Sequence, residues 1–216
     1  MARRRDFGRL LRRLRQQRGL SQAALGDPYY TRAYISALEL GKARPAAAAL
    51  EHLANRLGVP VDELLDSTLA EEARPSLFLE LADRCLDRRD AESADRILRH
   101  LDFKRLQLPK QRFRYAVLQV RAAILKNSAA RARVWLKRAY AYTSPQLLND
   151  QALLEFYEGL LHHVQDHIHE ALAHYRTALA FLSRVEAPNL RLVTHLNRNL
   201  GTALWRLDQF HEGLQA

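Results

Sequence analysis

Apolar residues recur at helical spacing along the first 66 positions, and this pattern predicts five short helices. Apolar side chains at positions 7, 10, 11 and 14 share one face of a helix predicted over 6–17, and arginines lie on its opposite face. Ser21 and Thr31 are suited to be N-caps, because a hydroxyl can accept a hydrogen bond from a free amide of the first helical turn. The further helices are expected over 22–26, 32–40, 45–57 and 61–65.

The segment 66–76 (DSTLAEEARPS) interrupts the helical periodicity and ends near a proline. We therefore predict a linker over 67–76, between a first domain at 1–66 and a second at 77–216. The helical pattern resumes in the second domain. The chain has only 8 glycines and 7 prolines, and the expected fold class is all-α.

Small residues recur in the second domain, and the first three of them are each followed four positions later by a bulky apolar residue. The small positions are 38, 39 and 42 residues apart, and the set is Ala94/Leu98, Ala132/Leu136, Ala171/Tyr175 and Gly213. This spacing predicts about four stacked helix pairs that form a solenoid. The alternative is an unrelated helical bundle. The last pair is incomplete at Ala216, so we expect either a longer chain or a second copy to cover that end.

Positive charge is concentrated in the first domain. Residues 1–66 hold 12 Lys and Arg against 7 Asp and Glu, and the whole 216-residue chain has a net charge of +10. This charge favours a polyanionic partner. No run approaches the roughly 20 apolar residues of a membrane span, so no membrane partner is expected. Cys85 is the single cysteine and fits a reducing cytosol. The Arg-rich start lacks an apolar segment and a small-residue cleavage site, so we expect it to belong to the folded domain rather than to a transit peptide.

The first domain resembles a known family. The run GLSQAALGDPYYTRAYISALELGKARP, followed by ALEHLANRLGVPVDELL, is similar to the Cro/CI-type (XRE) helix-turn-helix domain over residues 6–66. The resemblance implies a five-helix, lambda-repressor-like fold that binds double-stranded DNA. The segment between Leu25 and Thr31 is one residue shorter than the usual pattern, which puts the direction of the third helix in question.

The resemblance also implies which residues contact DNA. Arg32 would pair with guanine, because its two-pronged guanidinium matches the O6 and N7 acceptors. Gln22 would contact phosphate and support the third helix, whereas Arg15 and Glu39 would form an internal ion pair. Tyr34 fits DNA and core equally well. The implied DNA-binding set is Gln22, Thr31, Arg32, Ala33, Tyr34, Ser36, Ala37, Lys42 and Arg44.

The second domain resembles tetratricopeptide (TPR) helix pairs, best in GLLHHVQDHIHEALAHYRTALAFL and NLGTALWRLDQFHEGLQ. In such a solenoid the first helix of each pair lines a concave groove that suits an extended peptide. The predicted effector groove contains Arg114, Arg121, Tyr157, His195, Arg198 and Asn199. The alternative is that the arginines are solvated, and that Tyr157 and Trp205 are core residues.

Histidines cluster at positions 162, 163, 167 and 169, beside Asp166. The repeat pattern places a turn between His163 and His167, no cysteine accompanies them, and no second cluster completes a tetrahedral set. We expect exposed histidines and no metal site, no cofactor and no enzymatic activity.

An XRE-type domain followed by TPR-like repeats resembles the Rgg/PlcR/NprR peptide-sensing transcriptional regulators. The resemblance implies a cytoplasmic, nucleoid-associated homodimer that binds DNA in a sequence-specific manner, with a peptide or partner protein as effector. The alternative is a nucleic-acid-associated TPR adaptor whose main role is protein–protein interaction.

Overall fold

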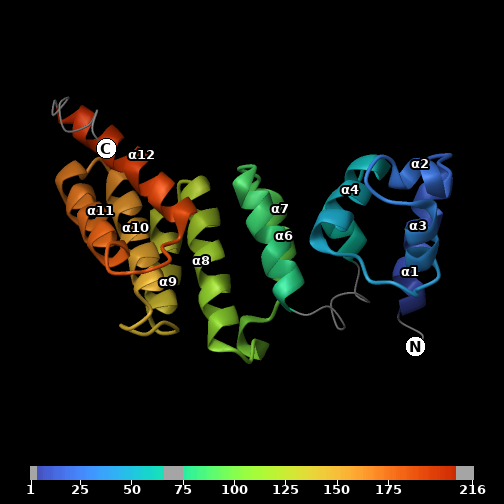
Figure 1. The fold of residues 1–216 in the computed structure, drawn as a ribbon, viewed down its shortest axis with the longest axis horizontal. Coiled ribbons are helices and arrows are strands. Elements are labelled where there is room, and N and C mark those ends of the chain that lie inside the picture. Colours follow the sequence, from blue (N-terminus) through green and yellow to red (C-terminus); the bar gives the residue numbers. More distant parts are fainter. Residues whose placement is uncertain (1–3, 66–74, 208–216) are drawn as a thin grey trace. The chain divides into compact units, whose positions relative to one another are not determined.

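The computed structural model describes residues 4–65 and 75–207. Within these ranges every regular element is a helix (Figure 1), which confirms the predicted all-α fold class. No helix among the described residues is long and apolar enough to cross a membrane.

Five short helices form the N-terminal part, as the hydrophobic pattern predicts. The elements are α1 (Arg4–Gln17), α2 (Gln22–Gly26), α3 (Arg32–Glu39), α4 (Ala47–Leu57) and the 3-10 helix η1 (Val61–Leu65). The Ser21 hydroxyl accepts a hydrogen bond from the amide of Ala24 at 3.0 Å, and Thr31 accepts one from Tyr34 at 3.2 Å, so both N-caps are confirmed. The fourth helix begins two residues later than predicted, because the extended Ala46 is its N-cap and Pro45 precedes it.

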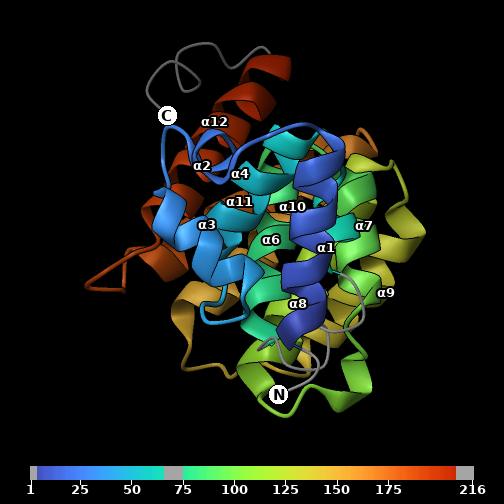
Figure 2. The ribbon, with the colours of Figure 1, turned by 90° about the vertical axis from the view of Figure 1, so that its right-hand side faces the viewer.

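Of the four apolar positions predicted to share one face of α1, Phe7, Leu11 and Leu14 are buried and Leu10 is half-buried. The core of these helices includes the fully buried side chains Leu11, Leu25, Ile35, Leu38, Leu50, Leu53, Leu64 and Leu65. Helix α1 runs beside α3 (Figure 2), and Gly8 permits their close approach. A Cβ at Gly8 would lie 2.2 Å from the carbonyl oxygen of Glu39, so the end of α3 rests directly on the backbone of α1.

The remaining helices form antiparallel pairs and one further helix. They are α6 (Pro75–Asp87), α7 (Ala91–Arg99), the 3-10 helix η2 (Phe103–Arg105), α8 (Pro109–Leu125), α9 (Ala129–Tyr140), α10 (Leu148–Val164), α11 (Ile168–Leu182) and α12 (Leu190–Arg206). The three small-and-bulky pairs predicted between 94 and 175 are all buried. The predicted small position Gly213 lies outside the described residues.

A left-handed residue closes the turn inside each complete helix pair. Arg89, Asn127 and Asp166 have φ angles of 63°, 53° and 67°. They are 38 and 39 residues apart, the same intervals that separate the small residues. The turns therefore share one backbone conformation, although the side chains at this position differ. Helical repeats account for this recurrence better than the alternative of an unrelated bundle.

The chain divides by compactness into Met1–Leu106 and Gln107–Ala216. The first unit holds the five N-terminal helices together with α6 and α7. Helix α6 begins at Pro75, within the predicted linker, because a proline is tolerated in a first helical turn. The rest of that linker lies outside the described residues, and the predicted domain limits of 1–66 and 77–216 stay a prediction.

Gly159 is a sensitive packing position in the second unit. A Cβ there would lie 2.6 Å from Cε1 of the fully buried Tyr175. We predict that Gly159→Ala lowers the free energy of unfolding by about 1–3 kcal/mol, the usual cost of overpacking a core. Urea denaturation measures the loss, which should be smaller in a Tyr175→Leu background. An equal loss in both backgrounds would contradict this packing explanation.

Candidate DNA-binding surface and helical groove

The predicted DNA-contacting residues form one surface around α3. Thr31, Arg32 and Ala33 are exposed at its N-terminal end, and Ser36 and Ala37 are half-buried one turn later. The two predicted phosphate-binding residues that follow the helix, Lys42 and Arg44, are also exposed. The surface is accessible and basic. Contact of each residue with DNA stays a prediction.

A buried carboxylate fixes the base of this surface. Arg15 donates to Glu39 from Nε at 2.5 Å and from Nη2 at 3.1 Å, and it also donates to the carbonyl of Leu20 at 2.8 Å. Gln22 donates from Nε2 to the second Glu39 oxygen at 2.8 Å. The side chain of Glu39 is only 4% exposed. The predicted Arg15–Glu39 ion pair is confirmed, and Gln22 links the start of α2 to the end of α3.

The network also controls the charge of Glu39. Burial favours the neutral acid, but the hydrogen bonds from Arg15 and Gln22 and the charge of Arg15 outweigh it, so the pKa of Glu39 is lowered. A lowered carboxyl pKa means that Glu39 contributes stability above its unfolded pKa and loses it as the pH falls through the folded value.

Aromatic side chains from the shortened segment pack against α3 and α4. Tyr30 stacks on Tyr34 with ring centroids 5.2 Å apart and lies 5.3 Å from His52. The imidazole of His52 is 3.1 Å from the carbonyl oxygen of Leu25, at the end of α2. Burial raises the pKa of Tyr34. The structure therefore gives Tyr34 a packing role, and its predicted DNA contact stays a prediction.

A second buried carboxylate joins α4 to α6. Glu51 is 6% exposed and accepts from Arg84 Nε at 2.6 Å and from Arg88 Nη1 at 2.8 Å. Arg96 of α7 donates to Asp62 of η1 at 2.8 Å. We call Glu51, Arg84 and Arg88 the Glu51 clamp. It was not foreseen from sequence, because charges more than 30 residues apart resemble ordinary surface charges.

The predicted effector-groove residues lie on α8, α10 and α12 and differ in exposure. Arg114 and Arg121 are half-buried, Arg198 is exposed, and Tyr157 is buried against Phe156 with centroids 5.2 Å apart. Phe156 also stacks on His195 at 6.3 Å, which joins α10 to α12. Asn199 donates to the carbonyl of His195 at 2.7 Å. The alternative core role holds for Tyr157 but is wrong for Trp205, which is 59% exposed. The groove stays a prediction as a binding site.

The histidine cluster is divided by a turn, as predicted, since α10 ends at Val164 and α11 begins at Ile168. The expected exposure is wrong for His162 and His163, which are half-buried. The ring of His162 stacks on His174 at 5.3 Å, and burial lowers the pKa of His162. Within 4–65 and 75–207, no three His, Cys, Asp or Glu side chains are grouped to hold a metal ion.

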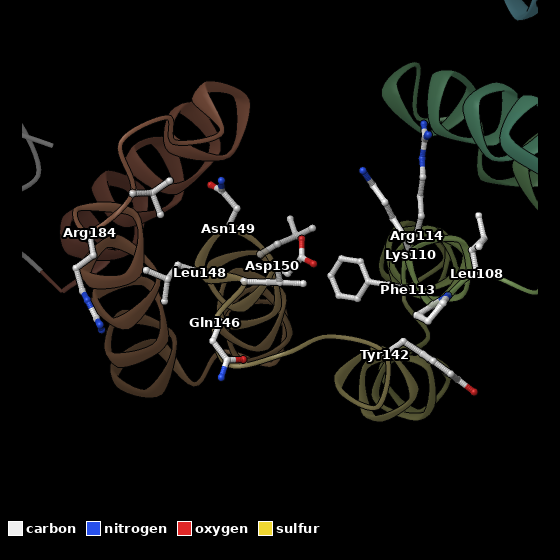
Figure 3. A pocket seen from close by; sticks show the side chains of 14 residues that line it. Leu108, Lys110, Phe113, Arg114, Tyr142, Gln146, Leu148, Asn149, Asp150 and Arg184 are labelled. Atoms are coloured by element: carbon white, nitrogen blue, oxygen red, sulfur yellow. The ribbon is translucent and has the colours of Figure 1, made fainter.

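A cavity of about 970 Å³ lies in the second unit, between the start of α8, the loop before α10 and the end of α11. Phe113 and Asp150 point toward one another across it (Figure 3). Lys110 and Arg114 extend from the α8 side. Arg114 belongs to both this cavity and the predicted groove.

Loss of the Glu39 charge should destabilise the first unit. In Glu39→Gln the guanidinium of Arg15, whose side chain is 12% exposed, loses its carboxylate partner. We predict a loss of about 3 kcal/mol, the lower end for breaking a buried ion pair. Thermal or urea unfolding measures it, and Glu63→Gln, at an exposed position of η1, is the matched control. Equal stability of the two variants would contradict a structural role for the network.

Comparison with known proteins agrees with this architecture. A family model described as a helix-turn-helix domain matches residues 6–66. The crystal structure of PlcR from Bacillus thuringiensis, in complex with the peptide PapR7 and DNA, is similar over 97% of this chain and 76% of that chain, with a TM-score of 0.54 and 16% identity. No curated protein matches the sequence.

The crystal structure of the pheromone receptor Rgg2 of Streptococcus dysgalactiae aligns with 97% of this chain and 91% of that chain, with a TM-score of 0.32 and 14% identity. At 16% identity the likeness to PlcR shows a shared fold. Residues 6–66 therefore match a helix-turn-helix domain, and the chain that carries them shares the fold of PlcR.

Proposed function

We propose that this chain is a cytoplasmic, dimeric transcriptional regulator that recognises a specific DNA sequence through α3. The observation that carries the proposal is the exposed N-terminal end of α3, with Arg32 at its first position and the buried Glu39 network at its last. Recognition helices of this class place their N-terminal residues against base edges in the major groove. The rigid base holds Arg32 in the orientation that such a contact needs.

The chemistry of the surface assigns a role to each side chain. Arg32 pairs with a guanine, and Ala33 and Ala37 offer apolar contact to thymine methyl groups. Ser36 adds a hydroxyl that can donate or accept a hydrogen bond. Thr31 is committed to its N-cap bond and lies where a phosphate would pass. Lys42 and Arg44 hold phosphates beyond the helix, and these contacts add affinity without sequence preference.

The fold supports a role for the second unit in dimerisation and effector binding. PlcR, which shares the fold, was crystallised with a peptide and DNA. A dimer that places two recognition helices roughly 34 Å apart would read two half-sites one helical turn apart. An effector that changes the dimer changes this spacing. The Glu51 clamp transmits such a change, because it ties the helix-turn-helix to α6.

Replacement of Arg32 tests direct base contact. We predict that Arg32→Ala lowers affinity for the preferred site by about 1–3 kcal/mol and relaxes selectivity at one base pair per half-site. Selection from random duplex DNA followed by titration measures both effects. Lys42→Ala is the control and should weaken all sequences alike, with a smaller salt dependence. If Arg32→Ala behaves as Lys42→Ala does, Arg32 contacts only phosphate.

Loss of the Glu51 clamp should relax the requirement for a fixed spacing between the two half-sites of the operator. In Glu51→Gln, Arg84 and Arg88 lose their shared counter-charge. We predict that the affinity penalty for operators with one or two base pairs inserted between half-sites becomes smaller than in the wild type. Titration of a spacing series measures it, with the exposed Glu63→Gln as control. An unchanged spacing penalty would mean that the clamp does not transmit geometry.

The same DNA selection distinguishes the regulator from the adaptor alternative. A defined inverted repeat supports a dimeric regulator. Binding that depends only on salt and shows no sequence preference would overturn the regulator proposal and leave an adaptor that DNA merely localises.

A further inference from the structure

The cavity in the second unit has the size and the walls of a small-ligand site. Its volume of about 970 Å³ is at the upper end of the range of roughly 300–1,000 Å³ that ligand pockets occupy. Apolar side chains form much of its wall, including Leu108, Phe113, Leu153 and Val185. A ligand that fills it must therefore carry a sizeable apolar part.

Part of the cavity wall is fixed by hydrogen bonds. Asn149, at the start of α10, donates to the carbonyl of Ala187 at 3.4 Å and accepts from the amide of Asn189 at 3.1 Å. These bonds tie the connector between α11 and α12 to α10. Since Arg184 and Val185 lie in the wall at the start of this connector, these bonds join the α10 wall of the cavity to the wall that follows α11.

The charges around the cavity favour an anionic group. Lys110 and Arg114 extend together from α8, whereas the side chain of Arg184 on the opposite wall is directed away from the cavity (Figure 3). Asp150 is the acidic residue of the lining, and burial raises its pKa. Two cations against one carboxylate leave the field positive, so a ligand carboxylate is attracted and a ligand ammonium is repelled.

We propose that this cavity binds an amphipathic acid, an apolar chain or ring that ends in one carboxylate. The apolar part lies against Phe113, Leu153 and Val185, and the carboxylate pairs with Lys110 and Arg114. The same chemistry is available from a free carboxylic acid and from the C-terminus of an apolar peptide. The site rests on the proposed function where that assigns effector binding to the second unit, but it is titrated without DNA, so failure of the site and failure of DNA recognition are distinguishable.

Three ligands with the same tail test the proposal on the full chain. Octanoate, octan-1-ol and octylammonium differ only in their head groups. Isothermal titration calorimetry should show octanoate binding roughly ten-fold more tightly than octan-1-ol, as one charge-assisted hydrogen bond provides, and octylammonium most weakly. Equal affinities, strongest binding of octylammonium, or no binding of octanoate or of the peptide described below would overturn the proposal.

Two substitutions locate the head group. Lys110→Gln should weaken octanoate several-fold, whereas Lys137→Gln, at an exposed position of α9 outside the cavity lining, should not change it. Asp150→Asn keeps the side-chain shape and removes the opposing charge, so it should strengthen octanoate. A weakening by Asp150→Asn, or equal effects of the two lysine variants, would contradict the assigned geometry.

A last comparison identifies the source of the acid. A tripeptide ending in leucine is titrated with a free and with an amidated C-terminus. If the tripeptide with a free C-terminus binds more tightly than both the amidated tripeptide and octanoate, the result supports the site and indicates that its ligand is a peptide. Binding of octanoate without the tripeptide supports it with a small acid. Equal binding of the free and amidated peptides, without octanoate, would overturn it.

Discussion

Within the first compact unit, the buried carboxylate of Glu51 is the group on which the attachment of the helix-turn-helix to α6 depends. A carboxylate that is 6% exposed is costly unless charges and hydrogen bonds compensate it. The compensation comes from Arg84 of α6 and from Arg88 in the turn that follows α6, both outside the helix-turn-helix. Separation of α4 from α6 would therefore leave Glu51 with neither arginine. This ionic contact, together with that between Arg96 and Asp62, lies within the first compact unit and joins its helix-turn-helix to α6 and α7.

Glu39 is a second buried carboxylate of this unit whose charge is compensated by hydrogen bonds and an arginine. It lies at the end of α3, and its partners come from α1 and the start of α2. Because Gly8 lets the backbones of α1 and α3 nearly touch, the ion pair forms without stretching either side chain. Within the first unit, Glu39 therefore fixes the end of α3, and Glu51 fixes α6, the first helix of the repeats. A displacement of α6 would reach α3 through these charged contacts and the packed core.

Short-range sequence patterns predicted the helices of the first domain, but they did not predict the contacts between α4 and α6. Ser21 and Thr31 cap helices through bonds within three residues, so sequence alone located those helices. The small positions of the repeats were visible for the same reason, since each lies four residues before its bulky partner. The Glu51 clamp and the cavity join residues more than 30 positions apart, and no local pattern marks such partners. His162 and His163 were predicted as exposed because a turn follows them, but packing of α11 against α10 covers them.

The sparse chemistry of α3 makes geometry part of recognition. One bidentate arginine pair discriminates by about 1–3 kcal/mol, whereas specific DNA binding exceeds non-specific binding by about 4–10 kcal/mol. Arg32 is the arginine available on α3, and its neighbours Ala33 and Ala37 offer only methyl groups. A single half-site therefore falls short of that difference. The remainder has to come from a second half-site at fixed spacing and from the shape of the DNA. If α3 reads DNA as proposed, a domain that contacts few bases must be held rigidly by the rest of its chain, and the Glu51 clamp is the contact proposed to supply that constraint.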